Sequence, residues 1–460
     1  MTQLLDGLRQ KHPRFFYRGY TVKMQGADSL RFGFDFEIEP GLCFGPEVVI
    51  EGVDGRRVAR LGEGTLSNIA FHLGLMEIPS YWKATCSPEI VIEAGRLDGA
   101  QVAWWHQLLI RGMGEFFFVN DIDFTASDFV RFRIDASDVS RVGFPYDGRL
   151  DGNRVLVPVG GGKDSAVTCE LLKNANKRLG CLALNPTLAA MDIIRASSSQ
   201  QSIVVTRSID ERLLRLNREG YLNGHTPFSA YLAFLGAACA VLFDYRYIAL
   251  SNERSSNEGN VGYRGVEINH QYSKSYDFEQ RFRGYSRRYL GGEIDYFSFL
   301  RPIYELQIAR LFSRFSHYFP YFRSCNRGQR TNSWCHGCPK CLFIYTALYP
   351  FVETDILTTS IFNEDLFERE ALVEVAFSLL GQGGVKPFEC VGAFEETLVA
   401  FYLCLKKAGG RLPMVLGAVA EGVLASERNM EARTRAVLEA WDVEHAIPSD
   451  FEGVLAEWVV

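Results

Sequence analysis

Residues 154–172, RVLVPVGGGKDSAVTCELL, decide how the centre of this chain folds. Residues 155–159 have strong strand character, three consecutive glycines follow at 160–162, and residues 166–172 begin a helix. The glycines let the backbone turn sharply and expose its N–H groups. Such N–H groups, together with the positive end of a helix dipole, form a site for phosphate. The stretch therefore predicts a strand, a phosphate-binding turn and a helix.

The details of this turn separate it from the Walker pattern G-x-x-x-x-G-K-[ST], because the glycines are contiguous and Asp164 follows Lys163. The turn resembles the S-G-G-x-D-S pyrophosphate loop of the N-type ATP pyrophosphatases, with Gly160 in place of the first serine. That resemblance implies cleavage of ATP to AMP and pyrophosphate, with Asp164 helping to hold Mg²⁺. The ATP ligands that it implies in the turn are Gly160, Gly161, Gly162, Lys163, Asp164 and Ser165.

Strands and helices alternate after this turn. Short apolar runs at 181–185, 202–206 and 246–250 predict strands, and the run at 228–243 predicts a buried helix. This alternation indicates an α/β fold with a parallel sheet, in which ligands bind beyond the carboxyl ends of the strands. The polar run 251–260 comes directly after a strand, so we expect it to lie across from the glycines.

Several side chains at these strand ends suit the binding of a nucleotide and Mg²⁺. Glu253 and Glu258 offer carboxylates that could join Asp164 around Mg²⁺, and Arg254 could meet a phosphate or a substrate carboxylate. Asn257 and Glu258 are predicted to contact the substrate, although a solvated loop is the alternative interpretation of this run. The predicted ATP ligands outside the glycine turn are Asn185, Ser251, Glu253 and Arg254.

The first 150 residues carry no nucleotide motif and predict a separate α+β domain. Residues 30–38 alternate as a strand does, and residues 64–75 and 97–113 predict helices. Between the helices, residues 77–88 fit neither periodicity and combine large aromatic side chains with a lysine and a cysteine. Core packing is one explanation of this segment and substrate recognition is another. For substrate recognition we predict Tyr81, Trp82, Lys83 and Asn120.

Side chains that can transfer a proton occur in three further segments. Residues 269–275, NHQYSKS, contain His270 and Lys274, and Cys86 lies near the end of the 77–88 segment. Cys390 belongs to the stretch KPFECVG, residues 386–392, whose proline and glycine predict a loop between helices. An interhelical connection and an active-site loop are both compatible with that stretch. These four residues are therefore candidates for proton transfer. A surface role for His270 and Lys274 stays open.

Four cysteines, Cys325, Cys335, Cys338 and Cys341, have the spacing C-x9-C-x2-C-x2-C. Four thiolates at such separations suit a closed tetrahedral Zn²⁺ site. An iron–sulfur cluster is the alternative, because four cysteines serve both kinds of centre. The short local arrangement favours structural zinc. Around this motif, residues 301–305 open a helix and residues 342–460 are expected to be mainly helical, with apolar faces at 372–380 and 396–405.

Length and composition limit the classes of function. The chain has 460 residues, 47% of them hydrophobic and 23% charged, as in a soluble globular protein of two or three domains. Its net charge of −6 and lack of a long Lys/Arg run disfavour an extended nucleic-acid surface. We expect no membrane span, no signal peptide, and reduced cysteines in a cytoplasmic protein. The expected domains are 1–150 for substrate, 151–320 for ATP, and 321–460 for the metal knuckle and helices.

The glycine turn and the cysteine motif together resemble the nitrile-forming synthase of the queuosine pathway over residues 154–345. A longer resemblance, along nearly the whole chain, is to the ATP-dependent UDP-N-acetylmuramoyl-L-alanyl-L-glutamate epimerases, the MurL family. The motifs that carry it, in order, are HLGLMEIPSYWKATCSP (72–88), GEFFFVND (114–121), VPVGGGKDS (157–165), SNERSSNEGN (251–260), NHQYSKS (269–275), WCHGCPKC (334–341) and KPFECVG (386–392).

The MurL resemblance implies that the terminal L-Glu of a UDP-MurNAc-dipeptide is inverted to D-Glu during peptidoglycan-precursor synthesis, with ATP and Mg²⁺. In that reaction Lys163 and Arg254 would offset phosphate charge, and Cys390, His270, Lys274 and Cys86 are the candidates for moving the α-proton. Two alternatives stay open. One is another adenylating enzyme, such as an amide or nitrile synthase or a sulfurtransferase, and the other is a regulator that binds ATP without turnover. The sequence leaves the oligomeric state undetermined.

Overall fold

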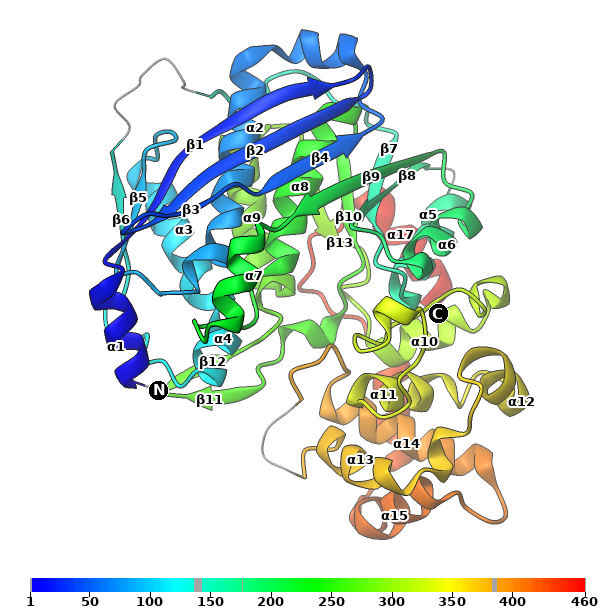
Figure 1. The fold of residues 1–460 in the computed structure, drawn as a ribbon. Helices are drawn as coiled ribbons and strands as arrows, with labels where there is room; N and C mark the ends of the chain where they lie inside the picture. The colour runs from blue at the N-terminus through cyan, green and yellow to red at the C-terminus, as the bar shows by residue number, and fades with distance from the viewer. Residues whose placement is uncertain (1, 136–142, 176, 383–386, 460) are drawn as a thin grey trace. The chain divides into compact units, whose positions relative to one another are not determined.

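The computed structural model describes residues 2–135, 143–175, 177–382 and 387–459 (Figure 1). The chain forms two compact units, each assembled from three separate stretches of sequence. Unit 1 comprises Met1–Leu156, Ile203–Ile248 and Gly262–Tyr296, and unit 2 comprises Val157–Ser202, Ala249–Val261 and Phe297–Val460. The division into domains at about residues 150 and 320 stays a prediction.

A mixed sheet of 11 strands runs in the order β13-β10-β7-β8-β9-β4-β2-β1-β5-β6, and β3 pairs with β2. The predicted α/β class is confirmed in this coarse form. Strands β7 and β10 pair in parallel, as do β1 with β5 and β5 with β6, whereas β4 pairs antiparallel with both β2 and β9.

Unit 1 holds both antiparallel and parallel strand pairs, together with helices. Its strands are β1 (Arg14–Gln25), β2 (Ser29–Ile38), β3 (Leu42–Phe44), β4 (Glu47–Glu51), β5 (Glu89–Ile92), β6 (Arg131–Ile134) and β12 (Val266–Ile268). Its helices are α1 (Thr2–Lys11), α2 (Gly55–Trp82), α3 (Gly99–Gly112), α4 (Gly114–Val119), α7 (Glu211–Arg218), α8 (Phe228–Phe243) and α9 (Tyr276–Tyr289).

Alternation along β2 builds the core of unit 1. Phe32, Phe34 and Phe36 are buried on one face of the strand, as its period of two requires. Helix α2 packs against β1 and β2, and it also contacts α8 (Figure 1). The predicted helix at 228–243 is confirmed with the same bounds, and it is buried along most of its length. Its apolar residues thus belong to the core.

The segment at 77–88 corrects one expectation. Residues 77–82, which showed no clear periodicity in the sequence, form the last turns of α2, and Pro79 lies inside the helix. The helical pattern is obscured because residues 68–82 are buried on every side of α2. Gly62 interrupts the helix with φ of 74°, so the regular part starts close to the predicted residue 64. Residues 114–119, also unassigned from the sequence, form the short helix α4.

Unit 2 contains β8 (Arg178–Leu184), and four strands have residues in both units: β7 (Arg154–Pro158), β9 (Gln201–Ser208), β10 (Tyr247–Leu250) and β13 (Asp295–Ser298). Strand β11 (Val261–Tyr263) also begins in unit 2 and pairs with β12. The predicted strands at 155–159, 181–185, 202–206 and 246–250 are thereby confirmed to within a few residues. Helices α5 (Lys163–Asn174), α6 (Leu188–Ala196) and α10 (Glu305–Phe312) belong to unit 2.

The carboxyl-terminal region is helical, as predicted. Its helices are α11 (Pro339–Leu348), α12 (Thr354–Ile356), α13 (Val373–Leu379), α14 (Phe394–Ala408), α15 (Met414–Gly422), α16 (Met430–Leu438) and α17 (Ser449–Val459). Helix α14 packs against α10, α11, α15 and α16 and is buried at residues 396–401. The helix expected to open at 301–305 begins at its last residue, Glu305.

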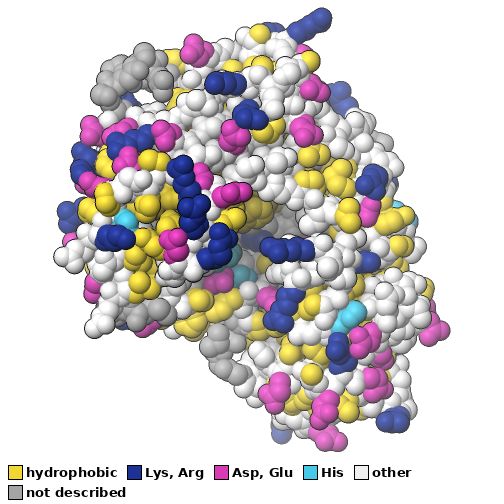
Figure 2. Space-filling model, in the orientation of Figure 1, with side chains coloured by type: hydrophobic (Ala, Val, Ile, Leu, Met, Phe, Trp, Pro, Cys, Tyr) yellow, Lys and Arg dark blue, Asp and Glu magenta, His cyan; other side chains and the backbone are white. Residues whose placement is uncertain are grey.

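Charged side chains of both signs are interspersed over the face in Figure 2, in keeping with a modest net charge of −6. Within the described residues, every helix is too short or too polar to cross a bilayer.

A buried ion pair at the end of α2 gives a test of this fold. Arg207 Nε and Nη2 lie 2.8 and 2.6 Å from the carboxylate of Glu77, and Arg207 Nη2 also donates to Ser80 Oγ. Glu77 is fully buried, so Glu77→Gln leaves the Arg207 charge in the interior without its counter-charge. We expect a loss of about 3 kcal/mol or more in the free energy of unfolding, measured by equilibrium urea denaturation.

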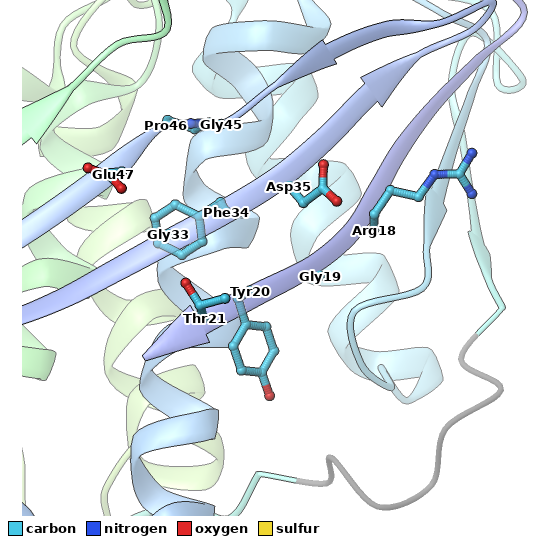
Figure 3. Close-up of a pocket in the computed structure, with 10 residues that line it drawn as sticks. All are labelled: Arg18, Gly19, Tyr20, Thr21, Gly33, Phe34, Asp35, Gly45, Pro46 and Glu47. Atoms are coloured by element: carbon cyan, nitrogen blue, oxygen red, sulfur yellow. The ribbon is translucent and has the colours of Figure 1, made fainter. Parts of the chain in front are cut away.

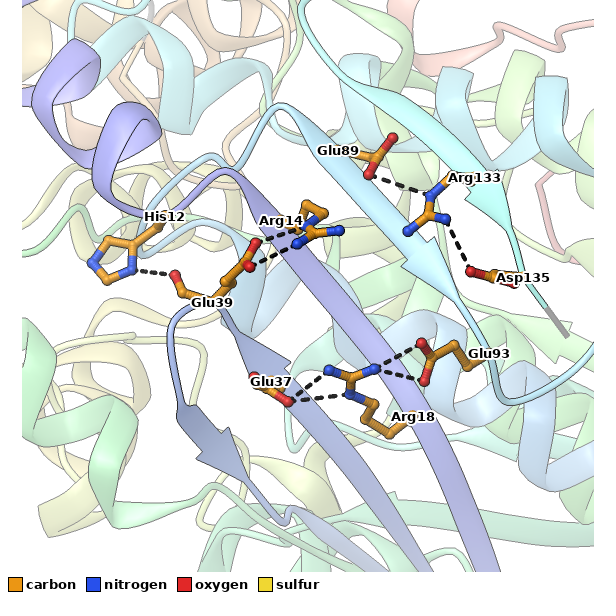
Figure 4. Close-up of polar contacts among 9 residues, drawn as sticks. All are labelled: His12, Arg14, Arg18, Glu37, Glu39, Glu89, Glu93, Arg133 and Asp135. Carbon is orange, nitrogen blue, oxygen red and sulfur yellow. Dashed lines mark hydrogen bonds and ion pairs between the residues drawn. The ribbon is translucent and has the colours of Figure 1, made fainter. Parts of the chain in front are cut away.

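The matched control is Glu93→Gln. Glu93 pairs with Arg18 (Figure 4), but both side chains are about one-third exposed. Exposed pairs contribute about 0–1 kcal/mol, so this variant should unfold almost as the wild type does. An equal loss in the two variants would contradict the importance of the buried pair.

Candidate functional site

The glycine turn joins β7 to α5, as predicted from the sequence, and lies in unit 2. Gly161 has φ of +92°, and a Cβ atom there would lie 2.8 Å from Ala190 N and 2.9 Å from Ala189 Cβ, so only glycine fits. Gly162 is the N-cap of α5, where no described side chain caps the first turn. The first N–H groups of α5 could therefore bind an anion such as phosphate, and this role stays a prediction.

Lys163 is fully buried at the start of α5, where its ammonium contacts the carboxylates of Asp164 and Glu305. Burial lowers the pKa of Lys163, but the attraction of Asp164 and Glu305 outweighs it and raises the pKa overall. Burial, followed by repulsion from Asp164, raises the pKa of Glu305, and the nearby Glu253 acts in the same direction. Asp164 and Glu305 thus place two carboxylates against one ammonium group, and Glu253 is an electrostatic neighbour of Glu305.

The predicted loop after β10 is held by Arg301, which is fully buried. Arg301 Nη1 donates to Glu253 O at 2.9 Å and to Ser256 Oγ at 2.7 Å, and Arg301 Nη2 donates to Ser298 Oγ at 3.2 Å. These bonds fix a short 3₁₀ turn at Arg254–Asn257. The polar run is therefore an ordered part of unit 2 and not a freely solvated loop.

The other predicted ATP ligands differ in their surroundings. Ser251 Oγ donates to Thr168 Oγ1 on α5 at 2.9 Å, so this residue is tied to the helix that follows the glycine turn. Arg254 lies over the Tyr304 ring at 4.6 Å, with its Nε 3.4 Å from Asp442. Asn185, which directly follows β8 and has φ of 44°, is exposed, as are the substrate candidates Asn257 and Glu258. Their ligand roles stay predictions.

Cys390 is half-buried in the loop before α14. Asn260 Nδ2 donates to Pro387 O at 3.1 Å, which connects this loop to the run at 251–260 within unit 2. Lys340 N donates to Glu389 Oε2 at 3.2 Å and ties the same loop to α11. Lys386, the first residue of the KPFECVG motif, lies outside the described residues.

Two predicted substrate contacts in unit 1, Tyr81 and Trp82, are fully buried. Trp82 Nε1 donates to Ser87 O at 2.8 Å, and Tyr81 OH accepts a bond from Asp210 N at 3.0 Å. Cys86 is also fully buried, and burial raises the pKa of its thiol. Substrate contact by the two aromatic residues and proton transfer by Cys86 stay predictions.

Lys83, Asn120, His270 and Lys274 are brought into one region of unit 1. Lys83 Nζ donates to Gly224 O at 2.7 Å, and Asn120 Nδ2 donates to the neighbouring Asn223 O at 3.1 Å. His225, which follows Gly224, lies with its ring centroid 6.5 Å from that of His270. The positive charges of His270, Lys83 and Lys274 all act on His225. Three other parts of the sequence, represented by Lys83, by Asn120, and by His270 with Lys274, therefore come together near residues 223–225.

A polar hollow of about 410 Å³ lies elsewhere in unit 1, over β1 and β2 (Figure 3). Arg18, Tyr20 and Asp35 line it, and burial raises the pKa of Asp35. Its lining contains none of the residues predicted for the site. Arg18 is already paired with Glu37 and Glu93 (Figure 4), so the hollow supports no role in the predicted chemistry.

Three residues at these sites were missed from the sequence. Glu305 and Arg301 belong to the stretch RPIYE, in which only a helix start was recognised, because their partners are far away in the sequence. His225 stands three residues before the predicted 228–243 helix. A histidine or acidic residue beside a helix start is a weak signal, so sequence reasoning alone had no reason to select these residues.

The four cysteines converge in unit 2, as their spacing predicted. The Sγ atoms of Cys325, Cys335, Cys338 and Cys341 lie within 4.8 Å of one another and could hold a metal ion such as zinc. Gly328 N donates to Cys325 Sγ at 3.2 Å, and Cys341 N donates to Cys338 Sγ at 3.4 Å. Backbone N–H groups aimed at sulfur stabilise thiolates, so the donor set and its surroundings fit a metal ion.

Metal analysis tests this centre. We expect about one equivalent of zinc per chain and a colourless protein, because the four thiolates form one local tetrahedral site. Cys338→Ser should lose most of the zinc and melt at a lower temperature, since binding of a structural metal contributes to folding free energy. Cys404→Ser is the control, because Cys404 is buried but lies outside the cluster. Detection of iron together with visible absorbance would contradict the zinc assignment and identify the centre as an iron–sulfur cluster.

Comparison with known proteins matches both parts of the chain to one family. Residues 8–299 match the MurL N-terminal domain and residues 321–434 match the MurL C-terminal domain. No solved structure matches the chain.

Three curated relatives carry the name UDP-N-acetyl-alpha-D-muramoyl-L-alanyl-L-glutamate epimerase. The protein from Salinispora tropica is 34% identical over 364 residues, which cover 78% of each chain. The protein from Xanthomonas oryzae pv. oryzae is 33% identical and covers 79% of this chain and 81% of its own. The protein from a Micromonospora species is 33% identical over 78% of this chain and 79% of its own. This chain belongs to the MurL family.

Proposed function

We propose that this protein is an ATP-dependent epimerase that converts the terminal L-Glu of UDP-MurNAc-L-Ala-L-Glu to D-Glu. The observation that carries the proposal is the match to three relatives named for action on this dipeptide, over more than three-quarters of both chains. The substrate is a small nucleotide-sugar peptide used in peptidoglycan synthesis. The need for ATP places the reaction in the cytoplasm.

The chemistry explains why ATP would be used. The α-proton of a free carboxylate is barely acidic, because its removal would build a second negative charge beside the first. Adenylation of the carboxylate removes that first charge and lets the enolate spread onto the acyl oxygen. A base and an acid can then exchange the proton. Hydrolysis of the adenylate would release the D-isomer with AMP, after pyrophosphate has left.

Residues of unit 2 support the adenylation step. The glycine turn and the first N–H groups of α5 would bind the phosphates, as in an N-type ATP pyrophosphatase, and Lys163 and Arg254 would offset their charge. Asp164, Glu253 and Glu305 are the carboxylates that would hold Mg²⁺. When bound, Mg²⁺ would neutralise phosphate charge and favour departure of pyrophosphate.

The four cysteines would have a structural role. Zinc bound there by four thiolates would leave no open position for substrate, as in closed structural sites. It would instead fix the start of α11, because Cys338 is the N-cap of that helix. The loop with Cys390 contacts the same turn through Glu389 and Lys340, so the metal would also order that loop.

Incubation with ATP, Mg²⁺ and UDP-MurNAc-L-Ala-L-Glu in D₂O tests the epimerase proposal. We expect D-Glu with deuterium at Cα, together with AMP and pyrophosphate, because the proton returned to carbon comes from an exchangeable group. Chiral analysis of the hydrolysed product and mass spectrometry measure the two results. A folded protein that binds ATP but forms neither D-Glu nor pyrophosphate would point to a regulator. Pyrophosphate release without D-Glu would point to another adenylating enzyme.

Asp164→Asn tests the assignment of the glycine turn. Loss of this carboxylate should lower pyrophosphate release by about 100-fold or more, since it removes charge from the metal and phosphate site. Asp450→Asn is the control, because Asp450 also lies in the first turn of a helix but is exposed on α17. Similar rates of pyrophosphate release from both variants would refute the role of Asp164.

A further inference from the structure

A cluster of basic side chains lies in unit 1. It consists of Lys83 at the end of α2, His225 before α8, and His270 and Lys274 in the stretch that precedes α9. Lys83 and His270 are buried, with 9% and 8% of their surface exposed. Gathering groups that can carry like charge in a buried place costs free energy, so such a cluster is a candidate for a functional site.

His225 is paired with a carboxylate that orients its ring. Its Nδ1 lies 3.3 Å from Glu115 Oε2, in the first turn of α4, and both side chains are partly exposed. A carboxylate at Nδ1 favours the tautomer that leaves the Nε2 lone pair available to accept a proton. Burial, and then the charges of His270, Lys83 and Lys274, lower the pKa of His225 to about 4. The ring is therefore neutral at pH 7 and able to act as a base.

Lys83 has the complementary protonation state. Its Nζ donates to the carbonyl oxygen of Gly224, the residue directly before His225, at 2.7 Å. Burial, followed by repulsion from Arg207, lowers the pKa of Lys83 to about 8. Lys83 is thus mostly protonated at pH 7 but releases its proton more easily than an ordinary lysine. An ammonium group with a pKa near the working pH is an effective general acid.

We propose that His225 removes the α-proton of the activated glutamyl residue and that Lys83 returns a proton to the same carbon. This inference rests on the epimerase function proposed above and names residues for its central step. As His225 Nε2 takes the proton, the C–H electron pair moves onto the acyl group to form the enolate. The enolate then takes a proton from the Lys83 ammonium, which becomes a neutral amine. The imidazolium and the amine regain their original states by proton exchange with water.

The neighbouring candidates fit this step less well. Cys86 is fully buried, its Sγ lies 3.9 Å from Lys83 O, and burial raises the pKa of its thiol. His72 lies in the core of unit 1, where its nitrogens contact Asn68 O and Tyr285 OH. His270 and Lys274 act on His225 through their charge and help to keep it neutral. The pair combines a base oriented by Glu115 with an acid that is hydrogen-bonded to the carbonyl oxygen of the residue before that base.

Two substitutions separate proton exchange from adenylation. His225→Asn removes the base, and Lys83→Gln removes the acid but keeps an N–H donor for Gly224 O. Each purified variant is incubated in D₂O with ATP, Mg²⁺ and UDP-MurNAc-L-Ala-L-Glu. We expect both to lose about 100-fold or more of D-Glu formation while pyrophosphate release stays within about threefold of the wild type. Lys83→Gln should still introduce deuterium into recovered L-Glu, because His225 is intact, whereas His225→Asn should not.

The controls distinguish the two proposals. A wild-type protein that forms no D-Glu would refute the epimerase function itself. A wild-type protein that forms D-Glu, with either variant within tenfold of it, would overturn only the acid–base pair. The reverse deuterium pattern would overturn the assigned roles. Loss of pyrophosphate release in either variant, at an unchanged melting temperature, would also overturn the assigned roles. The pair would then act before proton exchange.

Further variants guard against effects of folding. His106→Asn, on α3 and outside the cluster, should keep wild-type activity. If His225→Asn or Lys83→Gln has a lower melting temperature than the wild type, His225→Gln or Lys83→Met is used in its place. The same loss of D-Glu formation with retained pyrophosphate release is expected.

Discussion

The buried ammonium of Lys163 is the constraint around which unit 2 is organised. A charge without solvent is tolerated only when opposite charges and hydrogen bonds replace the water. Asp164 beside it on α5 and Glu305 at the start of α10 provide that replacement, so the glycine turn, α5 and α10 must come together for the charge to be compensated. The same end of α10 is tied to α14, because Leu306 N donates to Glu396 Oε2 at 3.0 Å. One buried cation thus connects the turn after β7 to the carboxyl-terminal helices.

Features with a local cause could be predicted from the sequence. The turn after β7 needs glycine at 161 because of its positive φ, the 228–243 helix is apolar throughout, and the four cysteines are close in sequence. Features with a distant cause could not. The pairing of β4 with β9 joins residues about 160 positions apart, and the helical periodicity of residues 77–82 is hidden by burial on all sides. Predicted ligands such as Asn185 and Asn257 stay predictions.

The two units carry different kinds of charge at their candidate sites. In unit 2, carboxylates outnumber the buried ammonium of Lys163, which suits a site for Mg²⁺ and phosphate. In unit 1, burial and then the charges of His270, Lys83 and Lys274 lower the pKa of His225 and keep it neutral, which suits movement of a proton. Adenylation and epimerisation need these opposite environments: the first must offset the negative charge of phosphates, and the second must hold an uncharged base beside a charged acid.

Each unit is built from three stretches of chain that alternate along the sequence. A single cut in the gene between the codons for residues 157 and 296 would therefore divide both units, and neither unit could be inherited, exchanged or fused to another protein as one continuous piece. The two units would have to evolve together. Variation in this lineage is consequently expected as point changes and surface insertions within a fixed chain order, rather than as recombination of separate modules.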